Sequence, residues 1–114
     1  MTNLQDLSFL KTMILEQVIL PVIAGKEAEF KAAFAEAESI IASMSGYRGH
    51  TLQQCMEEPN QFLLLVNWAT LEAHTVGFRG SAEYQQWKAL LHHFYEPFPT
   101  VYHFEPVSGT ISLS

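Results

Sequence analysis

The sequence has a single cysteine, few basic residues and no long apolar run. Cys55 alone excludes an intrachain disulfide and a cysteine-rich metal site. Six Lys and Arg residues stand against twelve Asp and Glu, a formal net charge of −6, so the clustered cations that bind phosphates are missing. No stretch approaches the ~18 uninterrupted apolar residues of a membrane span, and residues 1–6 lack the basic start of a signal peptide. We therefore expect no nucleic-acid or membrane partner, and the cytoplasm as location.

The length and the apolar content predict one compact domain. The chain has 114 residues, of which 48% are hydrophobic and 16% charged, and this balance excludes disorder and collagen-like repeats. A chain of this size buries about 60–70% of its unfolded surface, which is enough for one core. We expect an N-terminal arm over residues 1–12, a domain over 13–107 and a C-terminal tail over 108–114.

The first half of the chain predicts a strand, a helix and a hairpin. An apolar run over residues 13–20, ended by Pro21, is typical of a buried strand. A helix then runs to Ser45-Gly46, because the apolar residues before this stop signal recur every three or four positions: Phe30, Phe34, Ala37, Ile41 and Met44. Residues 47–57 and 61–68 flank a turn, and we expect them to pair as a hairpin.

The second half predicts a short helix, a long helix and a last strand. Thr70 is expected to cap a helix over residues 71–78. Ser81 caps the long helix, and residues 100–105 form the strand. The apolar stripe of the long helix consists of Tyr84, Trp87, Leu91 and Phe94. The order β-α-β-β-α-β predicts an α+β fold of the ferredoxin-like type, with a four-stranded antiparallel sheet and both main helices on one face.

This fold leaves one apolar face of the sheet without cover. The side chains of residues 61–68 alternate between the two faces, and both sets are apolar. Two helices cover only one face. An uncovered apolar face of several hundred Å² usually marks an interaction surface, and a two-fold dimer is its simplest closure. We therefore predict a homodimer through the sheet face. The alternative is that residues 1–12 fold over the sheet.

Several segments resemble the antibiotic biosynthesis monooxygenase (ABM) family. They are Val66-Asn67-Trp68-Ala69-Thr70-Leu71-Glu72-Ala73-His74, Phe78-Arg79-Gly80-Ser81-Ala82-Glu83-Tyr84-Gln85-Gln86-Trp87, Met44-Ser45-Gly46-Tyr47 and Glu57-Glu58-Pro59-Asn60-Gln61-Phe62. The family has a Trp at the end of its third strand, an acidic-Ala-His element on its short helix and a Ser-x-Glu-aromatic start to its last helix. The resemblance covers residues 13–107.

The resemblance implies a dimeric α+β barrel built from two ferredoxin-like protomers, with a pocket between helices and sheet. Some members are monooxygenases that oxidise quinols or polycyclic phenols with O2 and use neither metal nor flavin. A second branch binds and degrades haem, and other members have no established activity. On this basis we expect a small aromatic substrate and no cofactor or metal. Where the haem branch has its axial His, this chain has Lys88, which speaks against haem.

The resemblance also selects the candidate site residues. His74 is the candidate base that takes a proton from a phenol, with a surface His as the alternative. Gln17, at the place of a family Asn, is the candidate that holds a substrate oxygen; its alternative is a structural hydrogen bond. The candidate substrate-binding side chains are Trp68, Phe78, Tyr84 and Trp87, each of which could instead fill the core.

The other histidines give no clear site. His92 and His93 are adjacent on a helix and point about 100° apart, so we expect both to face solvent and neither to share a metal ion. His50 and His103 lie in predicted strands and stay unassigned. The two favoured functions are a cofactor-independent monooxygenase and a non-catalytic dimer that binds a small molecule, and a haem-binding or haem-degrading protein is the third, less favoured alternative. Convergence of His74 and Gln17 on one cavity would favour the enzyme.

Overall fold

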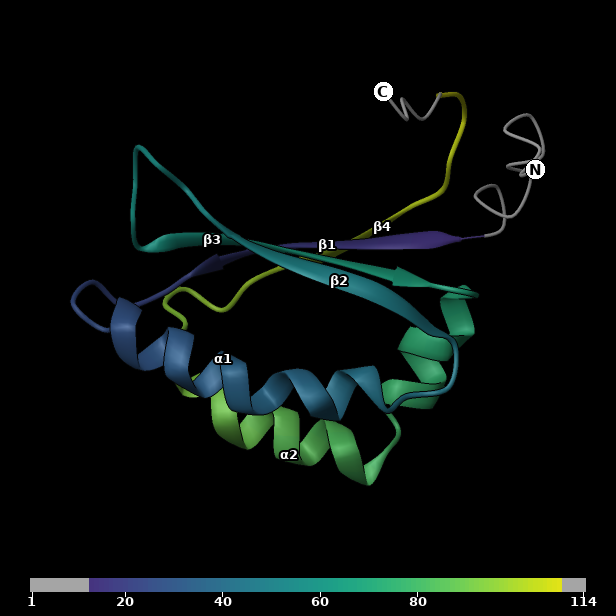
Figure 1. Cartoon of the computed structure of the whole chain (residues 1–114), viewed down its shortest axis with the longest axis horizontal. Coiled ribbons are helices and arrows are strands. Elements are labelled where there is room, and N and C mark those ends of the chain that lie inside the picture. Colours follow the sequence, from purple (N-terminus) through teal and green to yellow (C-terminus); the bar gives the residue numbers. More distant parts are fainter. Residues whose placement is uncertain (1–12, 110–114) are drawn as a thin grey trace, which may run out of the picture.

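The computed structural model describes residues 13–109 and has the predicted ferredoxin-like fold. Its elements are β1 (Ile14–Pro21), α1 (Glu27–Ala42), β2 (Tyr47–Gln54), β3 (Gln61–Trp68), η2 (Ala73–Phe78), α2 (Ala82–Leu91), η3 (His92–Phe94) and β4 (Val101–Phe104). The four strands form an open sheet in the order β2-β3-β1-β4, and every pairing is antiparallel. Both α-helices lie on one face of this sheet (Figure 1). The predicted arm over residues 1–12 and residues 110–114 of the predicted tail lie outside the described residues.

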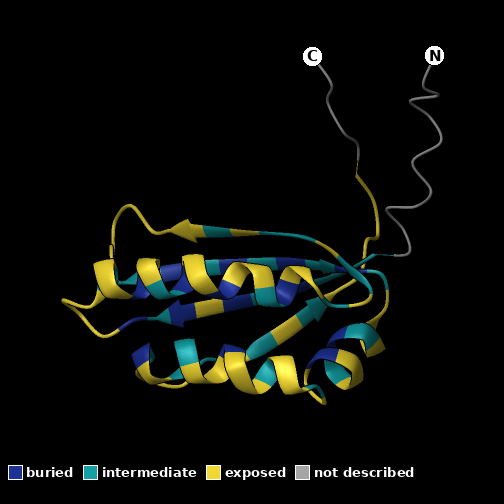
Figure 2. Cartoon of the chain, turned by 60° about the horizontal axis from the view of Figure 1, so that its bottom comes forward, coloured by how far each residue is buried: buried dark blue, intermediate teal, exposed yellow. Residues whose placement is uncertain are grey.

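The core lies between the sheet and the two helices, as the apolar spacing predicts. In β3 every second side chain is buried, which puts Phe62, Leu64, Val66 and Trp68 on the helix side. From α1 the buried side chains are Phe30, Phe34, Ala37 and Ile41. The predicted stripe of the second long helix is likewise buried at Trp87, Leu91 and Phe94, while Tyr84 packs against it half-buried. Figure 2 shows this division between buried and exposed sides along both helices.

The helical segment between β3 and α2 differs from the expected regular helix. The predicted cap is present, because the backbone N–H of Ala73 donates to Thr70 Oγ1 at 3.1 Å. The turns that follow are a π-helix, η2, rather than an α-helix. Ser81 caps α2 as predicted, accepting from the N–H of Tyr84 at 3.1 Å. The expected long helix ends at Leu91, and a 3-10 turn carries Phe94 into the core.

A glycine brings the turn before β2 close to η2. Gly46 has φ +85°, in the left-handed region that favours glycine, and a Cβ there would lie 2.6 Å from Ala73 Cβ. Its carbonyl accepts a 2.7 Å hydrogen bond from the N–H of Ala69. The end of β3 and the start of η2 are therefore held against this turn.

The sheet face opposite the helices is open and partly apolar. Ile19 is 55% exposed, Tyr102 61% and Phe104 48%, and all three belong to the strands β1 and β4. Among the described elements, no helix lies on this side of the sheet (Figure 1). Within residues 13–109, no helix is both long and apolar enough to span a bilayer.

Candidate functional site

A cavity of about 370 Å³ lies between the sheet and the segment that runs from η2 to β4. We call it the helix-side cavity. Its walls are mostly apolar and aromatic, with a few polar groups, which is the usual make-up of a small-molecule site. The lining side chains are Glu16, Val18, Leu20, Leu64, His74, Phe78, Arg79, Tyr84, Trp87, His92, Tyr95, Phe98, Pro99 and Val101.

Glu16 is the buried acid of this cavity. It alternates with Val18 and Leu20 along β1, so it points toward the helices, and it is only 6% exposed. Its Oε1 accepts a 2.9 Å hydrogen bond from Trp68 Nε1. Burial raises the pKa of the Glu16 carboxyl above its usual value, and the Trp68 hydrogen bond and the nearby Arg79 charge oppose that rise. Glu16 therefore loses its proton at a higher pH than an exposed glutamate does.

His74 lies against Glu16 and is fixed by stacking. It is 3% exposed, and its ring stacks on Trp68 with centroids 5.3 Å apart and planes at 19°. Its Nε2 is 3.4 Å from Glu16 Oε1. Burial first, then the charges of Arg79 and His103, lower the pKa of His74 to about 3. The imidazole is therefore neutral at physiological pH.

His103 completes this cluster from the edge strand. In the register of the sheet, His103 of β4 is opposite Glu16 of β1, so both side chains stand on the helix side. His103 Nε2 is 2.8 Å from His74 Nδ1. Its side chain is half-buried, and burial followed by the Arg79 charge lowers its pKa. Glu16, His74 and His103 thus touch in series.

Three of the predicted substrate-binding residues line the helix-side cavity, and one does not. Phe78 stands between Tyr84 and Trp87, with edge-on contacts at centroid distances of 5.2 and 5.7 Å, and all three border the cavity. Trp68 is 0% exposed and lies behind His74, outside the lining. Its observed contacts are those of a core side chain that also positions the polar cluster.

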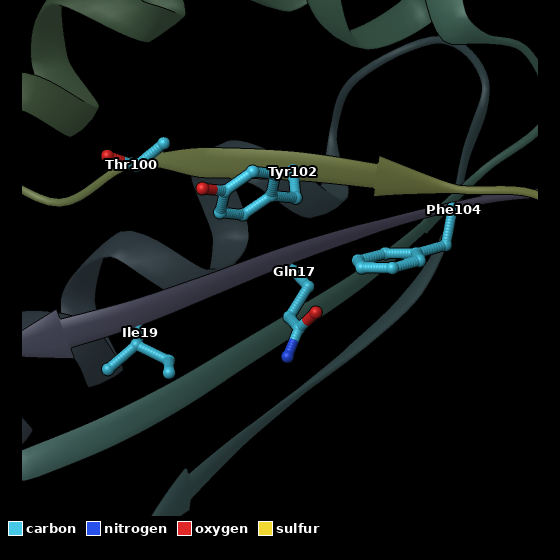
Figure 3. A pocket seen from close by; sticks show the side chains of 5 residues that line it. All are labelled: Gln17, Ile19, Thr100, Tyr102 and Phe104. Atoms are coloured by element: carbon cyan, nitrogen blue, oxygen red, sulfur yellow. The ribbon is translucent and has the colours of Figure 1, made fainter.

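Gln17 and His74 lie on opposite faces of the sheet. Gln17 is opposite Tyr102 in the register, and both border a hollow of about 390 Å³ on the open face, together with Ile19, Thr100 and Phe104. Figure 3 shows these side chains standing over β1 and β4. The two candidate catalytic residues, Gln17 and His74, therefore do not converge on one cavity of the chain.

The sequence did not single out Glu16 or Arg79 as site residues, and it left His103 unassigned. Alternation along β1 was the available signal for Glu16, since it shares the side of Val18 and Leu20. The expectation for His92 was wrong, because η3 turns its half-buried ring toward the helix-side cavity. Burial and the nearby Lys88 lower the pKa of His92.

The remaining histidines lie away from the helix-side cavity. His93 is exposed. His50 lies 2.6 Å from Glu38 Oε2 through Nε2 and 2.5 Å from Tyr47 Oη through Nδ1, which joins β2 to α1. Among residues 13–109, no group of three or more His, Cys, Asp or Glu side chains is arranged to hold a metal ion. Lys88, which the family resemblance places at the axial-His position of the haem branch, is exposed and does not line the helix-side cavity.

The comparisons with known proteins assign the family. Residues 13–90 match the antibiotic biosynthesis monooxygenase family. A structure from Bordetella bronchiseptica named for this family is 34% identical, with a TM-score of 0.81 and coverage of 85% of this chain and 99% of that one. The uncharacterized protein YczJ of Bacillus subtilis is 58% identical over 95 residues, which are 83% of this chain and all of YczJ. The chain belongs to the antibiotic biosynthesis monooxygenase family.

A more distant structure shares the fold. It is the monooxygenase from the gene ActVA-Orf6 of Streptomyces coelicolor, determined in complex with the ligand nanaomycin D. That protein is 13% identical to this chain, with a TM-score of 0.75 and coverage of 90% of this chain and 94% of that one. At this identity the likeness shows the common fold.

The buried His74 predicts a loss of stability in mild acid. Its pKa falls from 6.5 in the unfolded chain to about 3 in the fold. Between these values the unfolded chain binds a proton that the folded chain does not, so the free energy of unfolding decreases as the pH falls below 6.5. At pH 5 the His74 contribution is a loss of about 2 kcal/mol relative to neutral pH. Denaturant unfolding of the wild type and His74→Phe between pH 5 and 7.5 measures this contribution.

His74→Phe should remove this part of the pH dependence, while the matched control His93→Gln at an exposed histidine should retain it. The raised pKa of Glu16 makes the opposite contribution, because it increases the free energy of unfolding as the pH falls. The quantity to compare between the variants is therefore the slope of the free energy of unfolding against pH. Equal slopes in all three proteins would show that His74 is not held neutral by burial.

Proposed function

We propose that this protein is a monooxygenase that oxidises a small aromatic or quinol-like substrate with O2, without a bound cofactor, in the helix-side cavity. The observation that carries the proposal is a buried carboxyl group, Glu16, which contacts His74 and lines a cavity together with aromatic side chains. Membership of the antibiotic biosynthesis monooxygenase family supports this reaction class. The aromatic side chains suit a planar guest, and Glu16 supplies a base that can touch it.

The chemistry needs a base first and an acid later. Glu16 takes a proton from an acidic O–H or C–H bond, and the resulting electron-rich anion gives an electron to O2. Recombination of the substrate radical with superoxide forms a peroxide, which Glu16 protonates. The hydroperoxide then loses water and becomes a carbonyl group. In the overall reaction, a benzylic methylene group and one O2 become one carbonyl group and one water molecule. The substrate supplies all the electrons, and the protein supplies the proton transfers and the position.

In this proposal Glu16 takes the role of base that was expected of His74, and Gln17 does not hold the substrate. Glu16 faces the helix-side cavity directly, whereas Gln17 belongs to the open face. His74 borders the same cavity and contacts the carboxylate that would receive the substrate proton. Phe78, Tyr84 and Trp87 are the proposed substrate contacts.

The first test is oxygen uptake by chelator-treated protein with a panel of small quinols, naphthols and anthrones. We expect one O2 consumed for each carbonyl product formed. Phe98→Ala should raise KM for the best substrate about 3- to 10-fold, since Phe98 lines the cavity yet is 64% exposed and its loss should not disturb the core. The matched control is Met56→Ala, which removes a 92% exposed side chain outside the cavity and should leave KM unchanged.

We further propose that two protomers pack their open faces together as a dimeric α+β barrel. The exposed Ile19, Tyr102 and Phe104 supply the apolar surface for this contact. Gln17 would then lie in the seam between the two sheets, where its amide can bond to the partner.

A second candidate function is binding of a small aromatic molecule without turnover. The separation of Gln17 from His74 favours it, because the two predicted catalytic groups do not act on one ligand within a protomer. It predicts that a phenolic ligand raises the melting temperature while no member of the panel causes O2 uptake. Uptake with matching product would reject it.

A further inference from the structure

Glu16, His74 and His103 connect the helix-side cavity to the edge of the sheet. They come from β1, η2 and β4, and β4 is an edge strand. The contacts in series are 3.4 Å from Glu16 Oε1 to His74 Nε2 and 2.8 Å from His74 Nδ1 to His103 Nε2. We propose that these three side chains form a proton relay between Glu16 in the cavity and solvent beside His103. Its role in turnover rests on the proposed function.

The central imidazole is held as a relay requires. A neutral imidazole can accept a proton at one nitrogen while it donates from the other. His74 has Glu16 at Nε2 and His103 at Nδ1, so both of its nitrogens are engaged in the series. Stacking on Trp68 and burial fix the plane of the ring, and Trp68 Nε1 holds the same Glu16 oxygen.

Two proton arrangements are compatible with the distances of the series. With Glu16 ionised, His74 carries its proton on Nε2, the nitrogen 3.4 Å from Glu16 Oε1, and His103 donates from Nε2 to His74 Nδ1. With Glu16 protonated, the carboxyl proton faces an unprotonated His74 Nε2 and His74 donates from Nδ1 to His103 Nε2, which leaves the His103 proton on Nδ1. The second arrangement holds one more proton than the first. A concerted shift between them moves that proton from Glu16 out through His103 Nδ1.

Each end of the series has a free position within the described residues. Both protein contacts to Glu16 use Oε1, and no described group bonds Oε2 in the cavity wall. Likewise, no hydrogen bond from the described part of the chain reaches Nδ1 of the half-buried His103. A substrate proton can therefore enter at one end, and water can receive it at the other.

The Arg79 charge beside the series favours the neutral form of its two imidazoles. Arg79 follows η2, Tyr84 is on α2, His92 is in η3 and Tyr95 comes directly after it, with Lys88 near His92. The Arg79 charge opposes protonation of His74 and His103, and burial acts in the same direction. The imidazoles thus pass a proton without storing it as an imidazolium ion.

In turnover the relay would work in both directions. The substrate proton leaves through His103, so that it does not return to the anion before O2 reacts. A proton then enters by the same path and protonates the peroxide oxygen. Over one cycle the relay carries one proton out and one proton in. The overall reaction therefore stays as given above: one methylene group and one O2 become one carbonyl group and one water molecule.

Nitrogen NMR of protein labelled with 15N-histidine tests the relay without any substrate. We expect His74 and His103 to change from the Nδ1–H to the Nε2–H tautomer together, over the pH range in which Glu16 loses its proton. Neither ring should become an imidazolium ion in that range. In Glu16→Gln both rings should keep one tautomer across it. Independent changes of the two rings, or a change that persists in Glu16→Gln, would overturn the proposal.

Kinetics of His103→Gln test the relay in the reaction. We expect a loss in kcat of about 10- to 100-fold with KM unchanged, a shifted pH profile and partial recovery with added imidazole. The control His93→Gln should behave as the wild type. If O2 uptake occurs and His103→Gln keeps the wild-type kcat and pH profile, the relay is wrong and the proposed function stands. If the coupled tautomer change is seen but no substrate is oxidised, the relay stands and the monooxygenase is wrong.

Discussion

Trp68→Ala should lower the free energy of unfolding by about 3–5 kcal/mol, the usual cost of removing a fully buried aromatic side chain. Trp68 is 0% exposed, stacks on His74 and contacts Phe78 at a centroid distance of 5.8 Å. It also donates from Nε1 to Glu16, so its loss leaves a buried carboxyl oxygen with one partner fewer. Chemical denaturation at one fixed protein concentration measures the change, since association affects apparent stability.

The matched variant is Trp68→Phe, which keeps a ring beside His74 and removes the indole N–H. We expect a smaller loss of about 1–3 kcal/mol, mainly from the hydrogen bond that the buried Glu16 oxygen loses. From the sequence, Trp68 was predicted either to bind substrate or to fill the core, and this pair of variants distinguishes the two roles. A loss below about 1 kcal/mol in Trp68→Ala, together with weaker ligand binding, would instead favour a residue that stacks on substrate.

Ile19→Lys should convert the proposed dimer into a monomer. Ile19 is 55% exposed at the open face, so a lysine there has room and water in a single protomer. In a two-fold dimer closed through this face, each subunit would contribute one lysine to the interface. Two ammonium groups would then be buried, each at a cost of several kcal/mol. We expect the dissociation constant to rise at least about 100-fold, since each 1.4 kcal/mol is a factor of ten. Sedimentation velocity across micromolar concentrations measures it.

The control for this change is Val76→Lys, an equally apolar-to-charged substitution at a 68% exposed position on η2. It should leave the dimer intact. A wild-type protein that sediments as a monomer at micromolar concentration would contradict the open-face dimer. So would two lysine variants with the same small effect.

The fold could be predicted because its signals are local. The helical spacing of Phe30, Phe34, Ala37 and Ile41 and the alternation along β3 each need only a few neighbouring residues. The caps by Thr70 and Ser81 are equally local, and both are present. The π-helical form of η2 was not predictable in this way, because it depends on how the segment packs against β3 and the Gly46 turn.

The site could be predicted only in part, since its polar contacts are non-local. Alternation along β1 places Glu16 beside Val18 and Gln17 on the other face, yet the family resemblance drew attention to Gln17. His103 reaches Glu16 only through the register between β1 and β4, which are far apart in sequence. His92 enters the cavity because η3 departs from the helical direction of α2.

The close approach at Gly46 packs the turn before β2 against the start of η2. A Cβ at residue 46 would press on Ala73, the neighbour of His74, across a gap of 2.6 Å. The turn that joins α1 to β2 therefore packs directly against the residue that precedes His74. Any side chain at residue 46 would have to displace the start of η2, the element that carries His74.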